Sequence, residues 1–147
     1  MKSMSTRKMI LGLLILSFVG FAIGYLMTNS YDFGFCYSDF STNTFDVSCH
    51  DSYENIGNPL FYGMSALSII FLILTFLPET FPAWKKFAKW FIPLATLLFI
   101  FYPDPGSGDY LSPYPEQVFK WVSIVYVAVS LAIISWNLTK QKLNKVK

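Results

Sequence analysis

Charged residues are scarce in this chain and almost absent from its long apolar runs. Only 14% of the 147 residues are Asp, Glu, Lys or Arg, whereas soluble domains carry about 25%. The run at 59–77, PLFYGMSALSIIFLILTFL, has no charge and no histidine. A helix of that length crosses a hydrocarbon core of ~30 Å. This composition argues against a soluble monomer. It also argues against a transporter that works alone, because such proteins place charged residues inside the membrane.

Residues that support catalytic or metal chemistry are equally few. His50 is the only histidine, which excludes bis-histidine haem ligation within the chain and leaves zinc short of ligands. The chain has no Cys-x-x-Cys, GxSxG or phosphate-loop motif. Asp104 and Asp109 are weak candidates for a calcium site, but position twelve of an EF-hand counted from Asp104 is Pro115. We therefore expect no enzyme activity, no resident metal and no cofactor.

Four apolar segments predict membrane-spanning helices. The first reads as an uncleaved helix rather than a signal peptide, because no small-x-small cleavage site follows it before Asn29. The third is short, and Pro93 can bend it. The fold class is thus an all-α membrane protein, a single domain over 1–147 that forms a four-transmembrane-helix bundle. The expected spans are 9–27, 59–77, 86–102 and 118–138.

Basic and acidic residues lie on opposite sides of these spans. All Lys and Arg except Lys120 lie near the two termini or close to the loop 78–85. All Asp and Glu except Glu79 lie in the loops 28–58 and 103–117. The positive-inside rule then places both termini, including the tail 139–147, in the cytoplasm. The expected location is a bacterial cytoplasmic membrane or a eukaryotic plasma membrane. The short basic clusters need no nucleic-acid partner to explain them.

Both cysteines, Cys36 and Cys49, lie in the exterior loop 28–58. Two cysteines in one exported loop predict a disulfide, with unpaired thiols as the alternative. An antiparallel ribbon closed by this bridge would turn at 41–44, where the residues are of turn type. Side chains alternate along such a ribbon, so the expected cross-strand pairs are Cys36 with Cys49, Ser38 with Val47 and Phe40 with Phe45.

Small residues mark two helix faces that allow close approach. Gly20 and Gly24 form one such pair, and Ala128 and Ala132 form another. Packing inside the bundle is the expected use of these faces, and a dimer contact is the alternative for the glycine pair.

Aromatic residues in the exterior loops are candidates for contact with a partner. The alternative is that they only cover the top of the bundle. The candidates are Tyr37, Phe40, Phe45, Tyr53, Tyr110 and Tyr114.

The layout resembles that of the claudins and related tetraspan families. Those proteins have four spans, both ends inside and a cystine-linked β-hairpin in the first exterior loop, which Gly34-Phe35-Cys36 and Cys49 match. The paired tryptophans of that family are absent before Cys36, and the loop is shorter. The resemblance is one of layout, and it carries over no junctional or channel function.

These observations favour a non-enzymatic membrane protein that acts through a partner, as an accessory or immunity-type subunit. The partner would be another membrane protein, an exterior protein or a second copy of the chain. An oligomeric pore or small transporter is the alternative. A membrane thiol–disulfide exchange protein that uses Cys36 and Cys49 is a third hypothesis.

Overall fold

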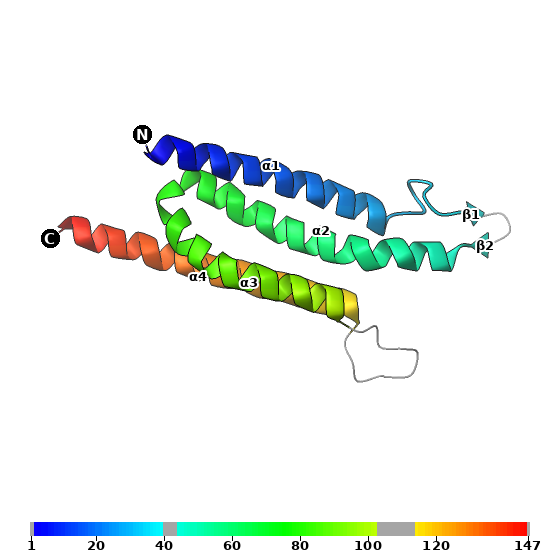
Figure 1. Cartoon of the computed structure of the whole chain (residues 1–147). Coiled ribbons are helices and arrows are strands. Elements are labelled where there is room, and N and C mark those ends of the chain that lie inside the picture. Colours follow the sequence, from blue (N-terminus) through cyan, green and yellow to red (C-terminus); the bar gives the residue numbers. More distant parts are fainter. Residues whose placement is uncertain (1, 40–43, 103–113, 147) are drawn as a thin grey trace.

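The computed structural model describes residues 2–39, 44–102 and 114–146, and most of them are helical. The helices are elongated and run along roughly one direction, and the two termini lie at the same end (Figure 1). A two-stranded antiparallel ribbon lies at the opposite end (Figure 1). The elements in chain order are α1 (Lys2–Thr28), β1 (Ser38–Asp39), β2 (Thr44–Phe45), α2 (Val47–Phe76), the 3-10 turn η1 (Pro78–Thr80), α3 (Phe81–Phe101) and α4 (Pro115–Val146).

Three of these helices are long and apolar enough to cross a membrane. The spans within α1, α2 and α4 are Thr6–Thr28, Val47–Phe76 and Pro115–Asn144, with mean hydropathies of 2.4, 2.0 and 2.0. Helix α3 has 21 residues and the length to cross, but Lys85, Lys86 and Lys89 lie in its first half. The all-helical architecture and three of the predicted membrane helices thus agree with the sequence.

Helices α1 and α2 pack closely because both carry glycine at their contact. A Cβ atom at Gly24 would lie 2.6 Å from the backbone nitrogen of Phe61, and one at Gly57 would lie 2.9 Å from that of Thr28. Further along the contact, the hydroxyls of Ser17 and Ser68 are 2.9 Å apart. The glycine face of α1 is therefore occupied by α2 of the same chain rather than left open for a second copy.

Helix α4 buries one stripe against α2 and α3. The stripe contains Phe119, Tyr126 and Ile134, spaced as on one helix face, together with buried serines. The indole nitrogen of Trp84 in α3 donates to the Ser130 hydroxyl at 3.3 Å. Ala128 and Ala132 lie off this stripe and are exposed. They therefore do not pack inside the bundle, contrary to the sequence expectation, because the larger residues of α4 make that contact.

The expected loop 28–58 is wrong in its second half, because α2 begins at Val47 rather than at 59. The Asp46 side chain caps the new helix by accepting from the Cys49 backbone nitrogen at 3.0 Å. Pro59 lies inside α2, where it removes one backbone hydrogen bond without ending the helix.

The predicted ribbon register is also wrong. Ser38 pairs with Phe45, and Asp39 pairs with Thr44, so the pairing is shifted by two residues. Val47 was expected opposite Ser38, but it is the first residue of α2 and cannot extend the strand. The ribbon is therefore short, and its turn falls outside the described residues.

Candidate functional site

The end of the bundle opposite the termini is covered by a compact unit, which we call the disulfide cap: residues 29–37, 44–45 and the first two turns of α2. Its Cys36–Cys49 disulfide confirms the predicted bridge. Cys36 is only 4% exposed. The bond links the segment after α1 to the first turn of α2, with the two Cα atoms 5.8 Å apart. The positions of α1 and α2 are thus tied covalently at this end.

A tight turn directs the chain from α1 to Cys36. The Ser30 carbonyl accepts from the backbone nitrogens of Phe35 at 2.8 Å and Cys36 at 3.3 Å. Gly34 adopts φ +70°, a left-handed conformation that glycine reaches without the steric cost of a Cβ atom. The hydrogen bonds of the turn and the disulfide together hold this segment against α2.

His50 lies within the cap, with its side chain 25% exposed. Its Nδ1 is hydrogen-bonded to the Ser30 hydroxyl at 2.7 Å, and its ring stacks on Tyr31 with the ring centroids 4.4 Å apart. Its Nε2 lies 3.7 Å from a Glu54 carboxylate oxygen. The single histidine therefore joins the turn after α1 to α2, and this structural role requires no metal.

Tyr31 completes this cluster. Its hydroxyl donates to the Asp46 carbonyl at 3.1 Å, and its ring meets Phe45 edge-on. Loss of contact with water, followed by the negative charges of Asp46 and Asp51, raises the pKa of the Tyr31 phenol. The phenol is neutral at physiological pH, as an unshifted phenol also would be, and it donates to the residue that precedes α2.

Replacing Asp46 by alanine should lower the free energy of unfolding by about 1 kcal/mol, because α2 loses its N-cap acceptor. Asp46→Asn is the matched control, since an asparagine oxygen caps the same nitrogen. The midpoint of thermal unfolding in detergent measures both. Equal loss in the two variants would mean that the charge, and not the cap, is responsible.

Aromatic and acidic side chains share the outer surface of the cap. Phe33, Phe35 and Tyr37 are all exposed, and Phe35 stacks on Tyr53 with ring centroids 5.8 Å apart. Asp32, Asp46 and Asp51 are exposed around them. The segment 28–58 contains no Lys or Arg to neutralise these carboxylates. The surface is therefore apolar and acidic together.

The predicted aromatic residues do not form one surface. Tyr37, Phe45 and Tyr53 belong to the cap, whereas Tyr114 precedes α4 at the outer end of the α3–α4 pair, which lies away from the ribbon (Figure 1). Phe40, Tyr110, Asp104 and Asp109 lie outside the described residues. Within residues 2–39, 44–102 and 114–146, no group of three His, Cys, Asp or Glu could hold a metal ion.

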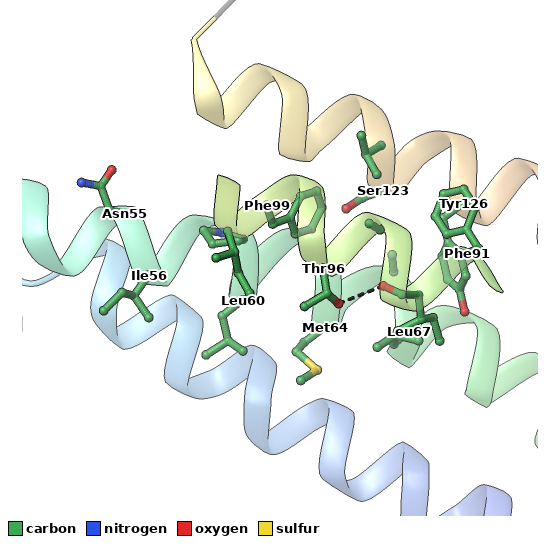
Figure 2. Close-up of a pocket in the computed structure, with 17 residues that line it drawn as sticks. Asn55, Ile56, Leu60, Met64, Leu67, Phe91, Thr96, Phe99, Ser123 and Tyr126 are labelled. Carbon is green, nitrogen blue, oxygen red and sulfur yellow. Dashed lines mark hydrogen bonds between the residues drawn. The ribbon is translucent and has the colours of Figure 1, made fainter. Parts of the chain in front are cut away.

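A second feature, missed by sequence reasoning, is an apolar pocket of about 560 Å³ among α2, α3 and α4. Figure 2 shows Leu60 and Met64 from α2, Phe99 from α3, and Ser123 and Tyr126 from α4 around it. Small residues at Gly63, Ala66 and Ala95 leave the space open, but nothing in the sequence indicates that these three positions meet.

No known protein family, curated protein or solved structure matches this chain. The function must therefore be argued from the cap and the pocket alone.

Proposed function

We propose that this chain is an integral membrane protein with four spans that binds an exterior protein partner through the disulfide cap, as an accessory subunit. Both termini lie in the cytoplasm in this arrangement. The observation that carries the proposal is the exposed aromatic and acidic surface on a cap held by a disulfide. A rigid surface of this kind loses little conformational entropy on binding.

Helix α3 is the fourth span in this proposal. Its 21 residues extend for about 31 Å, close to the ~30 Å hydrocarbon core. Lys85, Lys86 and Lys89 are all exposed, and their long side chains can reach the cytoplasmic surface from within the first turns. The two termini lie at one end of the bundle, as an even number of crossings requires (Figure 1).

The length of α2 supports an aqueous position for the cap. Its 30 residues extend for about 45 Å, which exceeds the hydrocarbon core by about 15 Å. The acidic residues of α2 and its histidine all lie in its first turns, at His50, Asp51 and Glu54. The excess length therefore projects on the cap side and raises the cap above the lipid chains.

Charge defines the expected partner. The cap presents both carboxylates and exposed aromatic rings, and it has no Lys or Arg in 28–58. The complementary surface is a protein segment with Lys or Arg flanking an apolar side chain. Charge pairs at the rim of an interface chiefly raise the association rate and make it sensitive to salt.

Replacing Tyr37 by serine should lower partner recovery at least tenfold, since aromatic residues at the centre of an interface often contribute over 1.4 kcal/mol. Tyr114→Ser is the matched control, because Tyr37 and Tyr114 are 66% and 69% exposed and only Tyr37 lies in the cap. The measurement is quantitative mass spectrometry of the protein extracted in mild detergent from its own membrane.

A defined hetero-complex with the natural chain would support the proposal. Tyr37→Ser should lose this complex, and the Tyr114 variant should keep it within twofold. Raised salt or Asp51→Lys should weaken it. Monomers alone would contradict the proposal. A closed homo-oligomer without a second protein would also contradict it and would favour the oligomeric pore.

A further inference from the structure

We propose that the pocket among α2, α3 and α4 binds one phospholipid of the cap-side leaflet, with an ester carbonyl on the Ser123 hydroxyl and an acyl chain along the apolar lining. The inference rests on the membrane placement proposed above and is independent of the protein partner. It assigns a ligand class to a region that the cap does not use.

The pocket has the size and chemistry of a ligand site. Its volume of about 560 Å³ lies within the usual range of ~300–1,000 Å³ for small-molecule sites. The lining is dominated by Leu, Ile, Phe and Met side chains, with a few polar groups between them. The Thr96 hydroxyl is already used, since it donates to the Ile92 carbonyl at 2.9 Å (Figure 2).

The pocket lining contains two buried hydroxyls without a hydrogen-bond partner in the described part of the chain, those of Tyr126 and Ser123, and Ser123 lies about one turn of α4 nearer the cap-side end. It is 9% exposed, and its hydroxyl has no hydrogen-bond partner in the described part of the chain. Figure 2 shows its oxygen directed toward Phe99 and Thr96, across the pocket. Buried hydroxyls are normally hydrogen-bonded, so an occupant with an acceptor at this position would satisfy the group.

The depth of Ser123 matches that of a lipid ester. Exposed Lys120 and Lys140 lie 20 positions apart on α4, about 30 Å, which is the thickness of the hydrocarbon core. Lys120 therefore marks the cap-side edge of the core. Ser123 lies three positions further along, about 4.5 Å inside that edge. The acyl ester joins the headgroup region to the hydrocarbon chains at this edge.

The pocket extends from this edge in both directions. Its lining on α2 runs from Asn55 to Leu67, twelve positions or about 18 Å. Asn55 is exposed at the outer end, and its carbonyl lacks a helical donor because residue 59 is proline. Polar groups thus lie at the outer end of the pocket, where a lipid headgroup would sit. Leu67 and Phe91 lie at the inner end, where an acyl chain would continue.

A lipid could enter from the side. Helix α4 packs closely on both α2 and α3, whereas the backbones of α2 and α3 lie further apart in the described part of the chain and meet through side chains such as Phe71 and Trp84. The pocket is therefore open to the outside of the bundle between α2 and α3. In a bilayer, lipid lies outside the bundle. No passage through the aqueous phase is needed.

The test compares ester-linked with ether-linked phosphatidylethanolamine, because the ether lipid lacks the carbonyl. Each lipid is added to the delipidated full-length protein in detergent, and bound lipid is counted by native mass spectrometry. We expect the ester lipid to bind roughly fivefold more tightly, as for one hydrogen bond, and Ser123→Ala to abolish this preference. Thr96→Val is the control and should keep it, since the Thr96 hydroxyl is bonded within its own helix.

A second pair of variants tests the pocket itself. Gly63→Leu should fill it, because a Cβ atom there meets only Phe99 at 3.6 Å and the longer side chain then enters the cavity. Bound lipid should fall at least tenfold, whereas Gly12→Leu, which adds the same side chain in open space, should leave it unchanged. Equal binding of ester and ether lipid to the natural chain would overturn the carbonyl contact. Retention of lipid by a folded Gly63→Leu variant would overturn the pocket assignment.

Discussion

Replacing Gly24 by alanine should force α1 and α2 apart and lower the free energy of unfolding by about 1–3 kcal/mol, the usual cost of overpacking. The added Cβ would lie 2.6 Å from the Phe61 backbone nitrogen and 2.8 Å from its Cα. Backbone atoms of a helix cannot rotate away as a side chain can. The two helices must therefore separate along the whole contact.

Two other glycines of α1 provide controls of the same chemistry. A Cβ at Gly20 meets only the flexible Met64 side chain, at 2.8 Å or more, so Gly20→Ala should cost less than Gly24→Ala. Gly12 has open space around it, so Gly12→Ala should be neutral or stabilising through helix propensity. Unfolding midpoints in detergent should follow the order Gly12, Gly20, Gly24 from most to least stable. Equal midpoints for the Gly12 and Gly24 variants would contradict the close packing of α1 and α2.

Removing the disulfide should cost about 3 kcal/mol, the value for a closed loop of about 15 residues in the chain-entropy model. Cys36 and Cys49 are 13 positions apart, so the loop is of this size. The loss should be local at first, because Ser30, Tyr31 and His50 still join the two segments. Amide hydrogen exchange of the Cys36→Ser/Cys49→Ser variant should rise in 29–54 while α3 and α4 keep their protection.

Cysteine variants also separate a structural disulfide from a thiol-exchange function. If the bond is structural, the double variant should bind less partner and show less amide protection in the cap. Conditions that stabilise the fold should then restore partner binding. If the bond exchanges electrons, the natural protein should equilibrate with a glutathione or thioredoxin couple, and Cys36→Ser should abolish activity without loosening the cap. The 4% exposure of Cys36 favours the structural role.

Much of the helical frame could be predicted from the sequence because charge-free stretches and loop charges are properties of composition. The disulfide could also be predicted, since Cys36 and Cys49 are the only cysteines and lie in one segment. The start of α2 could not be predicted in the same way, because its first turns are polar and carry no apolar periodicity. Asp46, an N-cap residue type directly before a helix-compatible segment, was the available signal.

The contacts of the site depend on tertiary geometry that spacing alone does not contain. Ser30 contacts His50 only because α1 and α2 pack closely. That close packing requires both Gly24 and Gly57, because a Cβ atom at either position would meet the backbone of the other helix. The pocket depends on how far α3 lies from α2, which follows from η1 and from the packing of Trp84 on Phe71. Ala128 and Ala132 show the reverse case, a small-residue pattern that is left exposed in the described part of the chain.

The hydrogen bond from the Tyr62 hydroxyl to the Glu116 carboxylate, at 2.7 Å, joins α2 to α4 less firmly than α1 is joined to α2. On one side of α2, a covalent bond and glycine contacts join α1 as a stiff hairpin. On the other side, at the same end of the molecule, this hydrogen bond and side-chain packing join α2 to the start of α4, without a covalent bond in the described part of the chain. We therefore expect a force that spreads the bundle to separate Tyr62 from Glu116 before it separates α1 from α2.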